Sequence, residues 1–206
     1  VGETGGKDYC LAHESCDIDV LVTAMVRGAF EYQGQKCSAM SRAYIPKSLW
    51  PEVKEKFISE VKTIKVGSPK DFSNFMNAVI DKSAFDTISN YIQFAKEHED
   101  AEIVVGGNCD DSIGYFIDPT AILTTDPHFR TMKEEIFGPV LTIYLYDTDK
   151  WDETIDLVDT TSEYGLTGCI IADDDKIIKQ ATRKLTHSAG NFYINDKPTG
   201  AVVGQQ

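Results

Sequence analysis

Apolar residues recur along the chain with two periods, one typical of helices and one typical of buried strands. Between Ile18 and Phe30 they fall at helical spacing, Ser15 and Asp17 are both possible caps, and Gly34 stops the run. Residues 5–7 indicate a flexible opening, residues 109–114 a loop, and residues 115–123 an extended segment. We predict helices over 18–33, 48–64, 83–97, 151–159 and 174–186, and strands over 43–45, 102–105, 139–146, 166–172 and 191–194.

Strands alternate with helices through the second half of the sequence, which predicts an α/β fold with a largely parallel sheet flanked by helices in three layers. Binding sites in such sheets lie outside the carboxyl ends of the strands. We therefore expect the loops that carry Cys37 and residues 195–201 to meet at that edge.

The composition is that of a soluble globular domain, with 206 residues of which 42% are hydrophobic and 26% charged. The net charge of −13 argues against nucleic acid or an anionic membrane as a partner. The apolar runs are far shorter than the roughly 20 residues that a membrane-spanning helix needs. Five cysteines form no metal-binding spacing and no disulfide framework, so we expect no metal and a reducing compartment.

Cys37 lies just past the first predicted helix, among small and polar residues. A cysteine attacks only as its thiolate, so a working thiol needs a nearby cation or backbone N–H groups. Lys36 brings a positive charge, Gly34 permits an unusual backbone bend, and Ser38 and Ala39 leave space for a carbonyl group. Cys37 is thus a candidate nucleophile, and the alternative is an inert packing cysteine.

Three motifs follow one another in the order found in the aldehyde dehydrogenase superfamily, which the whole chain closely resembles. They are Glu-Thr-Gly-Gly-Lys at 3–7, Gly-Gln-Lys-Cys at 34–37 and Lys-Glu-Glu-Ile-Phe-Gly-Pro-Val at 133–140. The resemblance implies that residues 1–206 are the catalytic domain of that family. It also implies a fragment without the NAD-binding Rossmann domain and the C-terminal segment, and no Gly-x-Gly-x-x-Gly motif is present.

Residues 30–39, 189–197 and 199–206 resemble one branch of the superfamily. Enzymes of that branch oxidise glutamate γ-semialdehyde, formed from 1-pyrroline-5-carboxylate, to glutamate with NAD+ during proline breakdown. The resemblance implies a small aldehyde as substrate and a homo-oligomer, dimer or higher, for the full-length enzyme. It also implies the mitochondrial matrix in a eukaryote, and the cytoplasm otherwise.

The resemblance assigns two catalytic residues. Cys37 would attack the aldehyde to give a thiohemiacetal and then, after hydride transfer, a thioester. Glu3 would activate the water that cleaves this thioester, for which a crowded or apolar setting should raise its pKa.

The remaining roles that the resemblance implies concern binding. Glu135 would hold the nicotinamide-side ribose of NAD, and Phe137 would flank the nicotinamide ring. The substrate would contact Ser38, Thr199, Gly200 and Ala201.

Three alternative interpretations remain open at this point. The first is that the chain is a catalytically incomplete structural or oligomerisation module, and the second is that it is part of an aldehyde dehydrogenase with another substrate. A third alternative is a thioesterase-like activity of Cys37 and Glu3 alone.

Overall fold

A seven-stranded sheet forms the centre of the computed structural model, which describes residues 2–200. Its strand order is β3-β6-β7-β2-β1-β8-β9, and all neighbours are parallel except β3, which runs antiparallel to β6 at one edge. The predicted largely parallel sheet is therefore confirmed. The strands of this sheet are β1 (Asp8–Ala12), β2 (Met40–Pro46), β3 (Ala101–Val105), β6 (Thr120–Thr124), β7 (Val140–Tyr146), β8 (Thr167–Ile171) and β9 (Asn191–Ile194).

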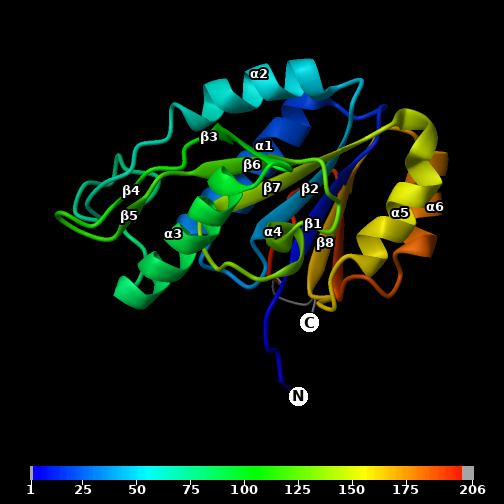
Figure 1. Ribbon diagram of the computed structural model, residues 1–206. Helices are drawn as coiled ribbons and strands as arrows, with labels where there is room; N and C mark the ends of the chain where they lie inside the picture. The colour runs from blue at the N-terminus through cyan, green and yellow to red at the C-terminus, as the bar shows by residue number, and fades with distance from the viewer. Residues whose placement is uncertain (1, 201–206) are drawn as a thin grey trace.

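Helices cover both faces of the sheet and make a three-layer domain (Figure 1). One face carries α1 (Ile18–Phe30) and α2 (Trp50–Val61), which share a core with alternate residues of the central strands. The other face carries α3 (Lys82–Glu97), α4 (Arg130–Lys133), α5 (Trp151–Thr160) and α6 (Asp175–Lys184) over a second core. Because the inner strands are buried on both faces, a strand such as β7 reads as a largely apolar run without alternation.

Helix α1 brings the chain to the cysteine motif. Asp17 caps its start, since the carboxylate accepts hydrogen bonds from the backbone N–H groups of Asp19 and Val20. The helix gives way to a 3-10 turn, η1 (Glu31–Gly34), in which Tyr32, Gln33 and Gly34 have positive φ values. This turn ends the helical path three residues before Cys37.

Strand β1 was missed by the sequence prediction, which treated the residues before it as a flexible opening. It pairs with both β2 and β8 and lies in the middle of the sheet. The strand is only five residues long, begins with a buried aspartate and has every residue buried, so it shows neither alternation nor a long apolar run.

Two smaller elements also differ from the prediction. The segment 109–114 was predicted as a loop, but β4 (Cys109–Asp110) pairs with β5 (Phe116–Ile117) in a separate two-stranded ribbon. A short 3-10 turn, η2 (Thr148–Lys150), precedes α5, and neither it nor the four-residue α4 was predicted. Elements this short carry too little periodicity to identify.

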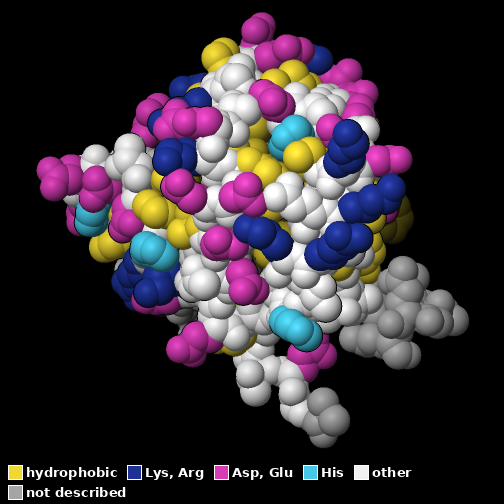
Figure 2. Space-filling model, turned by 90° about the vertical axis from the view of Figure 1, so that its right-hand side faces the viewer, with side chains coloured by type: hydrophobic (Ala, Val, Ile, Leu, Met, Phe, Trp, Pro, Cys, Tyr) yellow, Lys and Arg dark blue, Asp and Glu magenta, His cyan; other side chains and the backbone are white. Residues whose placement is uncertain are grey.

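The surface over α5 and α6 mixes charges of both signs (Figure 2). Lys184 there pairs with Asp152 and Asp156. Such a face is typical of a solvated surface. No helix within residues 2–200 is long and apolar enough to cross a membrane.

Candidate active site

The three motifs meet at the amino ends of the central strands. Cys37 comes just before β2, Glu3 comes before β1, and Glu135 comes before β7, and these strands are neighbours in the sheet. The expectation that Cys37 lies at the carboxyl ends is therefore wrong. Cys37 lies at the amino edge because it comes directly before β2, and a residue that directly precedes a strand lies at the amino end of that strand.

Glycines allow the motifs to approach this closely. A Cβ atom placed on Gly6 would lie 1.9 Å from the carbonyl oxygen of Cys37, and one on Gly34 would lie 2.2 Å from the carbonyl oxygen of Gly138. Gly34 also has a φ of +64°, which confirms the predicted unusual bend. The first and third motifs thus each pack against the loop that bears the thiol.

Glu135 is fixed by the first motif. Its Oε1 accepts a hydrogen bond of 2.8 Å from the backbone N–H of Gly6. A Cβ on Gly5 would lie 3.1 Å from its Oε2 and 2.9 Å from the ring of Tyr164. Glu135 and Tyr164 both line a groove of about 610 Å³, so this half-buried carboxylate is held in place with one oxygen still available to a ligand.

Cys37 is half-buried. Burial raises its pKa, and the charges of Glu3 and Asp8 raise it further, while the backbone N–H groups of Ser38 and of Cys37 itself act in the opposite direction. The ammonium of Lys36 lies 3.5 Å from Glu31 and so offers its charge to that carboxylate. The described residues therefore keep the thiol protonated at neutral pH.

The other four cysteines differ from Cys37 in setting. Cys10, Cys16 and Cys169 are buried in the core, and Cys109 lies in the separate ribbon. Burial raises the pKa of Cys16 to about 12 and that of Cys169 well above its ordinary value. Such thiols are inert.

Glu3 lies within electrostatic range of the thiol, because its charge is the second cause of the raised Cys37 pKa. Its side chain is exposed, so the crowded setting expected for it is not provided by the described residues.

Phe137 sits in the same loop as Glu135 with a positive φ of 58°, and it is 46% exposed. A bulky side chain rarely adopts this backbone conformation, and strain of this kind clusters at functional sites. The aromatic face is open to a planar ligand.

The predicted substrate residues come together in part. Ser38 is buried, and a Cβ on Gly200 would lie 3.6 Å from its hydroxyl oxygen. The hydroxyl of Tyr193 donates a hydrogen bond to the Gly200 carbonyl oxygen, and Thr199 is half-buried beside it. Ala201 lies outside the described residues.

Glu31 anchors this late segment to the cysteine loop, a role that the sequence analysis did not assign. Its carboxylate pairs with Arg27 in α1, with Lys36 in the cysteine loop and with Lys197, whose Nζ lies 3.2 Å away. Burial opposes ionisation, but hydrogen bonds from Arg27 and Lys197 bring the pKa of Glu31 below its ordinary value. The carboxylate is therefore the hub of a partly buried ion cluster.

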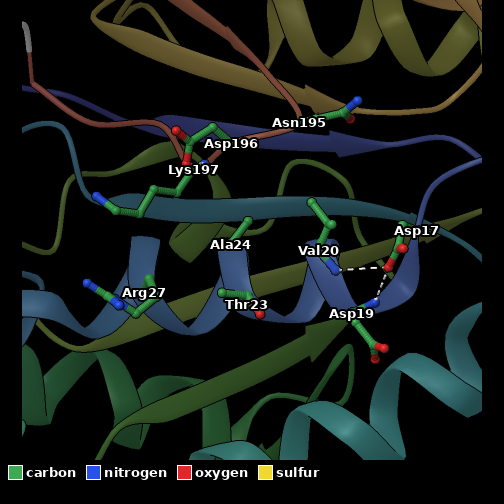
Figure 3. Close-up of a pocket in the computed structure, with 9 residues that line it drawn as sticks. All are labelled: Asp17, Asp19, Val20, Thr23, Ala24, Arg27, Asn195, Asp196 and Lys197. Atoms are coloured by element: carbon green, nitrogen blue, oxygen red, sulfur yellow. Dashed lines mark hydrogen bonds between the residues drawn. The ribbon is translucent and has the colours of Figure 1, made fainter.

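The segment 195–197 runs alongside α1 and closes one side of a groove of about 510 Å³ (Figure 3). Asp17, Val20 and Ala24 line the opposite side. The groove contains none of the predicted catalytic residues.

Three charged residues behind the site are buried, and the sequence analysis missed them. Lys7, Asp8 and Arg42 are each 1% exposed. Arg42 donates hydrogen bonds to the carbonyl oxygens of Lys7 and Val158, so it ties the start of β1 to the end of α5. Within residues 2–200 no group of three His, Cys, Asp or Glu side chains is placed to hold a metal ion.

The sequence matches the aldehyde dehydrogenase family over residues 1–206. The chain belongs to the aldehyde dehydrogenase family. The three motifs that meet around Cys37 all lie within the part of the chain that this family match covers.

Individual relatives place the chain more finely within the aldehyde dehydrogenases. It is 57% identical to the mitochondrial delta-1-pyrroline-5-carboxylate dehydrogenase of Dictyostelium discoideum, over all of this chain and 37% of the relative. It is 50% identical to the human protein of the same name, with the same coverage. A crystal structure of the delta-pyrroline-5-carboxylate dehydrogenase of Mycobacterium tuberculosis bound with NAD superposes with a TM-score of 0.93, at 47% identity, over all of this chain and 37% of that one.

Proposed function

We propose that this chain is the catalytic domain of an NAD+-dependent dehydrogenase that oxidises glutamate γ-semialdehyde, from 1-pyrroline-5-carboxylate, to glutamate in proline catabolism. The convergence of the three motifs on the half-buried Cys37 carries the proposal. The chain spans 37% of the relatives that it matches, so the activity is that of the longer protein.

Cys37 is the nucleophile in this proposal. The thiol first gives its proton to water, and the resulting thiolate sulfur bonds to the aldehyde carbon. The carbonyl electron pair moves to oxygen, where the backbone N–H of Cys37 stabilises the negative charge. Loss of hydride from the same carbon leaves a thioester on Cys37. A covalent intermediate replaces one difficult step by two easier ones.

Glu3 completes the reaction by taking a proton from the water that attacks the thioester. The tetrahedral adduct then expels the Cys37 thiolate and releases the product carboxylate. Because Glu3 is exposed in residues 2–200, we infer that the crowded setting it needs comes from the rest of the full-length protein.

The residues present fit a nicotinamide dinucleotide. The Gly6 N–H binds Oε1 of Glu135, so Oε2 can accept a hydrogen bond from a ribose hydroxyl. Phe137 presents an exposed aromatic face to the nicotinamide ring. When bound, NAD+ supplies the hydride acceptor. The NAD-bound neighbour from M. tuberculosis supports this assignment.

Ser38, Thr199, Gly200 and Ala201 hold the end of the substrate distant from the sulfur. The approach of Gly200 to the Ser38 hydroxyl supports this role. Glycine lets backbone N–H groups come close to a carboxylate, which glutamate semialdehyde carries.

The remaining proposals concern the longer protein. Its other part supplies the dinucleotide-binding domain and the C-terminal segment, and the whole assembles as a homo-oligomer. In a eukaryote it lies in the mitochondrial matrix, which the mitochondrial names of the Dictyostelium and human relatives support, and otherwise in the cytoplasm.

The test uses the full-length protein with glutamate semialdehyde and NAD+, and follows NADH absorbance. We expect turnover that is lost in Cys37→Ser and kept in Cys109→Ser, a matched control because both thiols are half-buried. Equal turnover of the two variants would contradict the nucleophile assignment. Faster turnover of an aldehyde without the α-carboxylate would overturn the substrate assignment alone.

A further inference from the structure

Asp8, the first residue of β1, is buried, and its two carboxyl oxygens differ in their hydrogen bonds. Its Oδ1 accepts two hydrogen bonds from Thr167, one of 2.6 Å from the backbone N–H and one of 2.7 Å from the hydroxyl. Its Oδ2 is buried without a hydrogen-bond partner in the described part of the chain. A buried, unpaired carboxylate oxygen is costly, so the environment favours a proton on Oδ2.

The free oxygen faces the nucleophile loop. A Cβ atom placed on Gly6 would lie 2.6 Å from Asp8 Oδ2 and 1.9 Å from the carbonyl oxygen of Cys37. The two oxygens therefore lie at most about 4.5 Å apart beside Gly6. Both are acceptors when Asp8 is ionised, and they can form a hydrogen bond only when Asp8 carries a proton.

We propose that Asp8 is a positioning residue for Cys37, to whose carbonyl oxygen it donates a hydrogen bond from protonated Oδ2. Loss of that proton removes this restraint on the Cys37 peptide and places a negative charge beside the thiol. The proposal rests on the proposed role of Cys37 as the nucleophile.

The surroundings of Asp8 place this switch near neutral pH. Burial raises the pKa of Asp8 to about 7, and Thr167 from β8 and the Arg42 guanidinium from β2 oppose the effect of burial. The other titratable groups that interact with Asp8 are Lys7, the preceding residue, and Cys37 in the nucleophile loop. Ionised Asp8 raises the pKa of the Cys37 thiol, so it slows formation of the thiolate.

The test measures alkylation of Cys37 by iodoacetamide against pH in the full-length protein, read by mass spectrometry on the peptide that carries Cys37. We expect the wild-type rate to bend near pH 7, where Asp8 ionises, before the plateau set by the thiol itself. In Asp8→Asn the amide keeps the acceptor for Thr167 and donates from nitrogen at every pH. This variant should lose the bend and react faster than wild type above neutral pH.

Thr167→Val provides an independent variant if Asp8→Asn fails to fold. It removes one hydrogen bond that lowers the Asp8 pKa, so the bend should move to higher pH. An Asp8→Asn profile that superposes on wild type, or an unmoved bend in Thr167→Val, would overturn the proposal. Because alkylation is read without turnover, this failure is distinct from failure of the proposed function, which shows as retained turnover in Cys37→Ser.

Discussion

Gly6 is the residue at which the three motifs of the site touch. Its N–H holds Glu135, and its missing side chain leaves room for the Cys37 carbonyl group, which a Cβ would approach to 1.9 Å. No side-chain rotation relieves this clash, because the atom in the way is backbone. The position therefore excludes every residue other than glycine.

We predict that Gly6→Ala in the full-length protein lowers kcat/KM by at least about 100-fold, since a displacement of about 1 Å at a reacting group has that effect. Steady-state kinetics with NADH detection checks this. Gly2→Ala is the control, because a Cβ there meets nothing within 4 Å among residues 2–200, and it should keep wild-type activity. Equal activities of the two variants would mean that the described packing around Cys37 is wrong.

Among single residues, the sequence analysis identified those that form motifs and missed the buried charged residues. Cys37, Glu135 and Phe137 stand in recognisable strings, whereas Asp8 and Arg42 look like ordinary surface residues. Charged side chains are rarely buried without a partner, so burial of these residues depends on contacts made from distant strands.

The position of the segment after β9 depends on an ion pair with the residue that follows α1. The two residues are far apart in the sequence, so no local pattern predicts their contact. Glu31, the first residue of η1 directly after α1, pairs with Lys197, and the chain then reaches Gly200 beside Ser38. Removal of the carboxylate charge should free the segment that we propose binds the substrate.

We predict that Glu31→Gln raises KM for the aldehyde about 5-fold with a smaller change in kcat, as expected for loss of about 1 kcal/mol from a partly exposed ion cluster. Steady-state kinetics on the full-length protein measures both constants. Glu153→Gln is the control, since that exposed residue pairs with Lys150, far from the site, and with no other cation among the described residues. A KM for Glu31→Gln equal to that of the control would refute the anchoring role.

Elements with strong periodicity were predicted well. The third helix was expected over 83–97 and spans Lys82–Glu97, because its buried residues recur every three to four positions. Strand β1 has no such pattern, and its place in the sheet is set by pairing with β2 and β8. That pairing also places the site at the amino edge, which a general rule for parallel sheets did not predict.

For the molecule as a whole, buried charge makes stability depend on pH. Burial and the nearby Arg42 charge lower the pKa of Lys7 from 10.5 to about 7, and its Nζ has no hydrogen-bond partner within residues 2–200. Between these two pH values the unfolded chain holds a proton that the folded chain lacks. Stability therefore rises with pH from about 7 to about 10.5 on account of Lys7.

We predict that Lys7→Met, which carries no buried charge, has a higher Tm than wild type below pH 7. The difference should shrink as the pH rises toward 10. Thermal unfolding of the full-length protein at a series of pH values measures it. Lys70→Met is the control at an exposed position and should show no such trend. A Lys7→Met difference that stays constant with pH would show that Lys7 is not buried as a cation.

The central claim is that the Cys37 sulfur carries an acyl group during turnover and that Glu3 directs its hydrolysis. The most direct measurement is mass spectrometry of full-length Glu3→Gln after mixing with glutamate semialdehyde and NAD+. We predict one equivalent of NADH in a burst, slow further turnover, and an acyl adduct on the peptide that contains Cys37. Undiminished steady-state turnover together with an unmodified Cys37 would contradict the account.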